Sequence, residues 1–170
     1  MSSFLMDEVT GIVRDAGGSV VGRTRLQKVA YLLTVTGLDD NFQFSYKHYG
    51  PFSEQLASSA HLASLVGKLR ERQDQAAWGG TYSTYTVEGA DEIDRSSVRF
   101  KLASEAVKAD SIELELAATA VFLSYDGYDN AWEETARRKP EKSTPQRLAN
   151  AQVLLNKLKQ IDVPKPLPDI

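Results

Sequence analysis

Apolar residues recur every three or four positions in two early segments, and this spacing predicts amphipathic helices. The first helix covers about residues 3–16. The second covers about residues 24–36, with Thr24 as its N-cap and Gly37 as its stop. The apolar positions that define the two helices are Leu5, Val9, Ile12, Val13 and Ala16 in the first, and Leu26, Val29, Ala30 and Leu33 in the second.

The next apolar pattern has a period of two, which is typical of an extended strand. It occupies "FQFSYKHY", residues 42–49. Gly50-Pro51 follows and is expected to end the extended run, because proline fixes φ and has no N–H. The side chains that the alternation turns toward the core are Phe42, Phe44, Tyr46 and His48.

A third helix is predicted over about residues 54–72, with Ser53 as its N-cap. A short β-hairpin, or wing, is predicted over residues 75–88, because Gly79-Gly80 signals a turn and the residues after it favour a strand. The apolar stripe of the third helix is expected to consist of Leu62, Leu65, Val66 and Leu69, with Leu56 leading into it.

The remaining chain predicts further helices. One of them covers residues 111–125, is apolar on most sides and is therefore expected to be central. The last has Thr144 as cap and Pro145 at its first position. The order of elements up to the hairpin is that of a winged-helix module. We therefore predict a mainly α (α+β) fold in one domain, residues 1–170. Its expected parts are a winged-helix-like part at 1–95, a helical extension at 96–160 and an extended tail at 161–170.

Composition narrows the class of protein. The 170-residue chain carries a net charge of −3, which argues against strong non-specific binding to nucleic acid. It has no cysteine, which excludes disulfides and thiolate metal sites. Its N-terminus lacks the basic region of a signal peptide, and no apolar run approaches the roughly 18–20 residues of a membrane helix. We expect a cytoplasmic protein that does not enter a membrane.

Catalytic motifs are weak in this sequence. His48 and His61 do not have the spacing of metal ligands, and no glycine-rich phosphate-binding motif occurs. We predict no enzymatic activity, no catalytic residue, no metal and no cofactor. The least favoured alternative is a hydrolase-like pair formed by His48 and Ser53, because no acid is placed to orient the histidine.

Three segments together resemble a known group of proteins. They are "GRTRLQKVAYLL" (22–33), "YKHYGPFSEQLA" (46–57) and "YTVEGADEI" (85–93). The combination is similar to the YwgA-like proteins and the Panacea domain of SocA-like antitoxins, and the resemblance covers nearly the whole chain. It implies a mostly helical, winged-helix-like fold. In the Panacea group it implies a small non-enzymatic protein that binds and neutralises a toxin, or delivers one for proteolysis.

A protein partner is therefore the leading hypothesis, such as a toxin or a component of a phage-defence locus. Aromatic and Arg side chains are favoured in protein interfaces. The competing hypothesis is a transcriptional regulator that binds DNA, and self-association is also compatible with the sequence. The expected partner-binding residues are Trp78, Tyr82, Tyr85, Arg23 and Arg25; the expected DNA-binding residues are Arg23, Arg25, Lys28 and Gln55.

Overall fold

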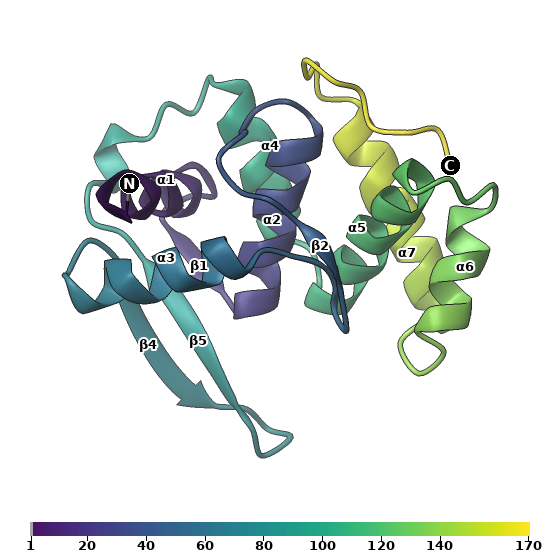
Figure 1. Ribbon diagram of the computed structural model, residues 1–170, viewed down its shortest axis with the longest axis horizontal. Coiled ribbons are helices and arrows are strands. Elements are labelled where there is room, and N and C mark those ends of the chain that lie inside the picture. Colours follow the sequence, from purple (N-terminus) through teal and green to yellow (C-terminus); the bar gives the residue numbers. More distant parts are fainter. Residues whose placement is uncertain (1) are drawn as a thin grey trace.

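The computed structural model describes residues 2–170 as a mixed α/β protein (Figure 1). Small antiparallel sheets of three and two strands lie beside the helices. The elements are α1 (Ser2–Asp15), β1 (Ser19–Val21), α2 (Arg23–Val35), β2 (Ser45–Lys47), β3 (Gly50–Phe52), α3 (Glu54–Leu65), β4 (Arg70–Gln75), β5 (Thr81–Thr86), the 3₁₀ turn η1 (Ala90–Glu92), α4 (Val98–Val107), α5 (Ser111–Tyr125), α6 (Ala131–Arg138) and α7 (Pro145–Lys159).

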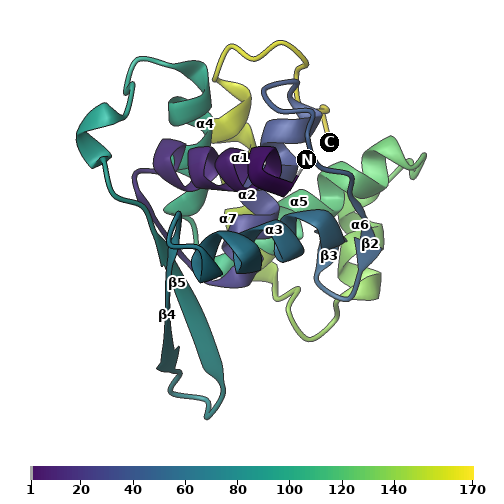
Figure 2. The ribbon, with the colours of Figure 1, turned by 60° about the vertical axis from the view of Figure 1, so that its left-hand side comes forward.

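The larger sheet has the strand order β1-β5-β4, with both pairs antiparallel. Its β4–β5 hairpin, here called the wing, projects away from the helices (Figures 1 and 2). The wing begins at Arg70, not at residue 75 as the sequence predicted, and the polar strand Arg70–Gln75 pairs along its full length with Thr81–Thr86. Strand β1 was not predicted, because three residues are too few to show a period.

The segment predicted as one extended strand is a small hairpin. Strand β2 covers only Ser45–Lys47 and turns back through His48 and Tyr49 into β3. The expectation that Gly50-Pro51 would end the extended run was wrong, since both residues belong to β3. Gly50 has φ +87°, a conformation that glycine adopts without strain, and this lets the chain reverse. His48 is exposed at the turn and does not face the core.

Helix α3 ends at Leu65, well before the predicted residue 72. Gly67, with φ +80°, terminates it, and the Lys68 N–H then bonds to the Ala63 carbonyl. The predicted apolar stripe was wrong at three positions, since Leu65 is 68% exposed and Leu62 and Val66 face solvent as well. Its other two members, Leu56 and Leu69, are buried. The face that α3 buries consists of Leu56, Ser59, Ala60 and Ala63.

The helix caps match the predictions at two of three positions. Ser53 caps α3, because its Oγ accepts a hydrogen bond from the Leu56 N–H. Thr144 caps α7 in the same way, with Pro145 at the first helical position. Thr24 does not cap α2: that helix begins after Gly22 and has no side-chain cap.

One hydrophobic core runs through both halves of the chain, from Val9 to Leu167. Helix α5 lies at its centre and is buried on nearly all sides, as its apolar sequence predicted. The tail is extended, but it is not loose. Leu167 is buried, and the Lys165 N–H bonds to the Thr36 carbonyl.

Candidate functional site

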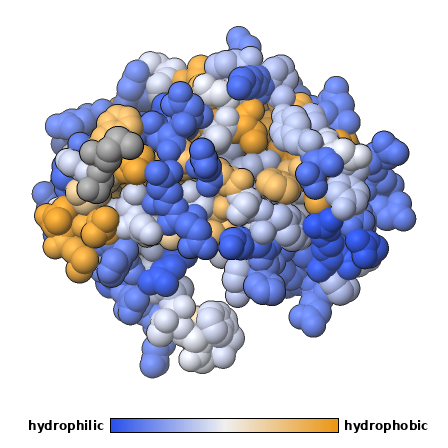
Figure 3. Space-filling view, in the orientation of Figure 1, coloured by the Kyte–Doolittle hydropathy of each residue, from blue (hydrophilic) through white to orange (hydrophobic). Residues whose placement is uncertain are grey.

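A hollow of about 720 Å³ lies between the wing and the start of α2. We call it the wing hollow. Four of the five predicted partner-binding residues line it, although they come from two separate parts of the sequence. They are Arg23 and Arg25 from α2, Trp78 from the wing turn and Tyr82 from β5. Figure 3 shows the tip of the wing standing clear of the body of the molecule, with a notch beside it.

Trp78 is the most exposed large apolar side chain in the described residues, at 77%. The backbone of the wing turn nevertheless supports it. The indole ring lies over Gly80, where a Cβ atom would overlap the ring. The neighbouring Gly79 has φ +94° and bonds through its N–H to the Ala76 carbonyl, which closes the turn. The two glycines therefore let the turn close and leave room for the indole ring against its backbone.

Tyr82 and Tyr85 lie on opposite faces of β5, because side chains alternate along a strand. Tyr82 faces the wing hollow, and Tyr85 is only 3% exposed and belongs to the hydrophobic core. Burial raises the pKa of the Tyr85 hydroxyl above its ordinary value. The expectation that Tyr85 would be an exposed anchor is therefore corrected: it packs β5 against the helices.

Arg23 stands at the centre of this region, with 68% of its side chain exposed. Its Nη2 atom lies 3.3 Å from Oε2 of Glu71 on β4. The hydroxyl of Ser83 also donates to that carboxylate, at 2.8 Å. Burial raises the pKa of Glu71, but the bonds from Ser83 and Arg23 outweigh this and keep the pKa below its ordinary value. Glu71 thus orients Arg23 as a charged group facing solvent.

Arg25, unlike Arg23, donates hydrogen bonds to backbone carbonyls of other elements. Its Nε donates to the Ala109 carbonyl at 3.1 Å, and its Nη1 donates to the Val21 carbonyl at 3.0 Å. These bonds tie the start of α2 to β1 and to the loop before α5. Arg25 lines the wing hollow, but much of its donor capacity is already used inside the protein.

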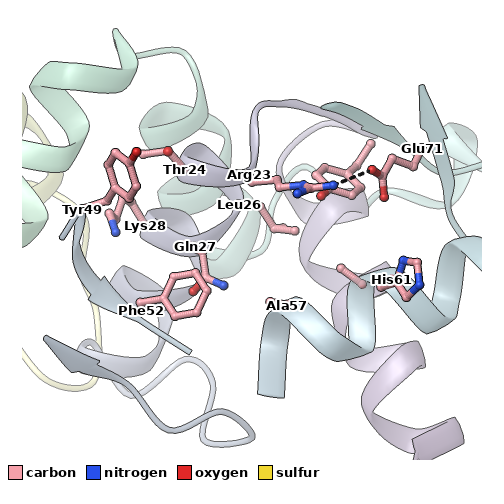
Figure 4. Close-up of a pocket in the computed structure, with 12 residues that line it drawn as sticks. Arg23, Thr24, Leu26, Gln27, Lys28, Tyr49, Phe52, Ala57, His61 and Glu71 are labelled. Atoms are coloured by element: carbon pink, nitrogen blue, oxygen red, sulfur yellow. Dashed lines mark hydrogen bonds and ion pairs between the residues drawn. The ribbon is translucent and has the colours of Figure 1, made fainter. Parts of the chain in front are cut away.

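A second cavity, of about 390 Å³, continues from Arg23 into the space between α2 and α3. We call it the inner cavity. Figure 4 shows Thr24, Gln27 and Lys28 reaching it from α2, and His61 from α3. Tyr49, at the turn of the small hairpin, lines both this cavity and the wing hollow. The two spaces therefore share part of their walls.

Lys28, predicted as a DNA contact, is 0% exposed and cannot reach a nucleic acid. Its Nζ donates to the Pro51 carbonyl at 2.7 Å. Burial lowers the pKa of this amine to about 7, although the Glu115 carboxylate partly opposes the effect. Lys28 therefore links α2 to the small hairpin.

Gln27 links α2 to the same segment through two further hydrogen bonds. Its Nε2 donates to the Ser53 carbonyl at 3.0 Å, and its Oε1 accepts from the Ser53 N–H at 2.8 Å. The "LQK" and "GPFS" parts of two motifs noticed in the sequence are thus direct contact partners. Sequence patterns gave no sign of this pairing, since they predicted Ser53 only as a helix cap.

A charged cluster below the small hairpin was also missed. The buried Glu115 lies 3.0 Å from the Nζ of Lys139 and 2.8 Å from that of Lys142. Lys139 also donates to the His48 carbonyl, and Lys142 lies over the Tyr49 ring. A buried Glu in the apolar run of α5 was the available signal, because such a residue needs a cationic partner.

Ser53 and His48 do not form a pair in the described chain. Ser53 is buried and its Oγ caps α3, whereas His48 is exposed, and no hydrogen bond joins their side chains. Gln55 is exposed in the first turn of α3. Within residues 2–170, no group of three or more His, Asp or Glu is arranged to hold a metal ion. None of the helices in that range has the length and apolar character that crossing a membrane requires.

In comparisons with known proteins, no family model matches this chain, and no curated protein is significantly similar to it.

Proposed function

We propose that this protein is a non-enzymatic, cytoplasmic binding module that docks a protein partner at the wing hollow, in the manner of the Panacea domain of SocA-like antitoxins. The partner would be a toxin or a component of a defence locus. The observation that carries the proposal is the meeting of Arg23, Arg25, Trp78 and Tyr82 in one hollow. Exposed Trp, Tyr and Arg side chains are the types that contribute most to protein interfaces.

The arrangement of elements supports a winged-helix-like build for this module. The observation in its favour is the order α1, β1, α2, α3, β4, β5 with the sheet order β1-β5-β4, in which β1 adds a third strand that the sequence did not predict. The small β2–β3 hairpin is inserted between α2 and α3. The contacts of Gln27 and Lys28 with Ser53 and Pro51 give the proposed family resemblance a physical basis, because its two most specific motifs hold one another.

The test is crosslinking in the native host followed by purification of the tagged protein. We expect a protein partner that is retained by the wild-type chain and lost from a Trp78→Ala, Tyr82→Ala variant. Tyr125→Ala is the matched control, because Tyr125 is an exposed aromatic residue outside both cavities. A partner captured equally by all three forms would contradict docking at the wing hollow.

A DNA-binding regulator is the second candidate, favoured by one observation. Arg70 and Arg72, which were predicted to end a helix, are exposed on the wing strand β4. Arg72 is paired with Asp74, and Arg70 lies near Glu88, so part of this positive charge is offset. A mobility shift with the promoter of its own gene tests the candidate: phosphate contacts require that affinity fall steeply as salt rises.

A further inference from the structure

The inner cavity has an apolar floor, to which Leu26 and Phe52 contribute, and one exposed cation, Arg23, in its wall. Ala57 and Ala60 of α3 line it without large side chains. The volume of about 390 Å³ lies within the range of specific ligand pockets. A space of this kind has room for a large apolar side chain from outside the protein.

The charge around the two cavities differs in sign from the charge of the whole chain. The protein carries −3 overall, yet Arg23 and Arg25 line the cavities beside a single carboxylate, that of Glu71. Lys28 also lines the inner cavity, but it is buried and its pKa is lowered to about 7. Arg23 remains largely exposed although Glu71 orients it. Complementary charge selects a partner and raises its association rate. The occupant should therefore carry negative charge next to its apolar group.

We propose that the inner cavity binds an acidic-apolar segment of a protein partner: one large apolar side chain fills the space between α2 and α3, and a neighbouring Asp or Glu reaches Arg23. The inference rests on the proposed protein-binding function and specifies the chemistry of the partner. Trp78 and Tyr82 then cover the adjoining part of the segment in the wing hollow.

The apolar floor favours a protein segment over duplex DNA. Duplex DNA offers phosphates, sugars and base edges, and its apolar groups lie within its grooves. None of these fills a cavity floored by Leu26 and Phe52.

The experiment uses the full chain as bait for a displayed library of random short peptides. We expect enriched peptides to contain Asp or Glu within a few residues of Leu, Ile, Met or Phe. Their binding should weaken about tenfold or more in Ala57→Glu, which places a carboxylate and extra volume at the cavity wall. It should also weaken as salt rises, because exposed charges are screened.

Ser58→Glu is the matched control. Ser58 is exposed on the same helix but does not line the cavity, so this variant should bind the peptides as the wild-type chain does. Circular dichroism of both variants shows that the fold is intact. Enrichment of basic peptides, or acidic-apolar peptides that bind Ala57→Glu undiminished, would overturn the inference. So would a duplex DNA probe that loses binding in Ala57→Glu while no peptide is enriched.

The two proposals can fail separately. If crosslinking shows a partner that depends on Trp78 and Tyr82, but no acidic-apolar peptide binds, the inference is wrong and wing docking stands. If the peptides bind as expected but the Trp78 and Tyr82 substitutions leave capture of the native partner unchanged, wing docking is wrong. The partner then binds through the inner cavity alone.

Discussion

The indole ring of Trp78 occupies the space in which a side chain at Gly80 would lie. An anchor that is already held in its binding position loses less conformational entropy on docking. Because Gly80 has no Cβ, the indole ring can lie against the backbone of the turn. The proposed binding surface therefore depends on this glycine.

Gly80→Ala should displace the indole ring and weaken partner docking without unfolding the protein. Trp78 can be observed alone in a Trp132→Phe background, because the chain has two tryptophans. We expect a changed acrylamide quenching rate for Trp78 in Gly80→Ala. Ala77→Ser, in the same exposed turn, should leave the quenching unchanged. Identical quenching in all forms would show that Gly80 does not position the ring.

Gln27→Ala should destabilise the protein by about 1–3 kcal/mol, because it leaves the buried N–H of Ser53 without a partner and removes one of the two hydrogen bonds to the Ser53 carbonyl. Urea unfolding measures the free energy. Gln55→Ala is the control: Gln55 is an exposed glutamine, and its loss should change stability by less than about 0.5 kcal/mol. Equal effects of the two substitutions would contradict the role given to the Gln27–Ser53 pair.

Stability should rise with pH above neutrality because of Lys28. Its pKa is lowered from 10.5 to about 7 in the folded protein, mainly by burial, with Lys139 and Lys142 adding to the effect and Glu115 opposing it. Between these two values the unfolded chain binds the proton and the folded chain releases it. The linkage relation then gives a gain of about 2 kcal/mol between pH 7 and pH 9.

Lys28→Met should remove most of that rise, as measured by urea unfolding at several pH values. A smaller rise should remain, since burial also lowers the pKa of Lys139. Lys157→Met, at an exposed position, should keep the full slope. Measurements should stop near pH 9, because the pKa of the buried Tyr31 is raised and acts in the opposite direction at higher pH. A slope unchanged by Lys28→Met would exclude this lysine as its source.

Gly50→Ala should destabilise the protein by more than backbone strain alone. The new Cβ would overlap Oγ1 of Thr119 on α5, and φ at Gly50 is +87°. Gly17→Ala isolates the strain, because Gly17 has φ +114° and open space around it. We expect about 1–3 kcal/mol for Gly17→Ala and more for Gly50→Ala. Adding Thr119→Ala should recover part of the difference; no recovery would contradict the overlap.

Local sequence patterns predicted the helices well where periodicity, cap and stop agreed. Helix α5 was predicted with its observed bounds, and α7 with its Thr144 cap, because each signal is local and strong. The pattern failed for α3, where Gly67 stopped the helix early and "RERQDQ" became a strand. That polar segment has little strand propensity of its own, and pairing with β5 decides its conformation.

The candidate site, too, could be predicted from the sequence only in part. Four of its residues were predicted from residue type, because aromatic and basic residues are favoured in protein interfaces. They are Arg23, Arg25, Trp78 and Tyr82. Their meeting in one hollow depends on how the wing folds beside α2. The three-residue spacing of Tyr82 and Tyr85 places them on opposite faces of β5, but only the tertiary structure shows that the face with Tyr85 is the buried one.

The sequence by itself determined most of the helical elements, the Ser53 and Thr144 caps and the aromatic and basic residues at the proposed surface, because these depend on local spacing and chemistry. Tertiary structure alone decided that Lys28 is buried against Pro51, that Gln27 holds Ser53 and that Glu115 gathers Lys139 and Lys142. The physical reason is distance along the chain: whether a charge is solvated or buried depends on segments that pack against it from many residues away.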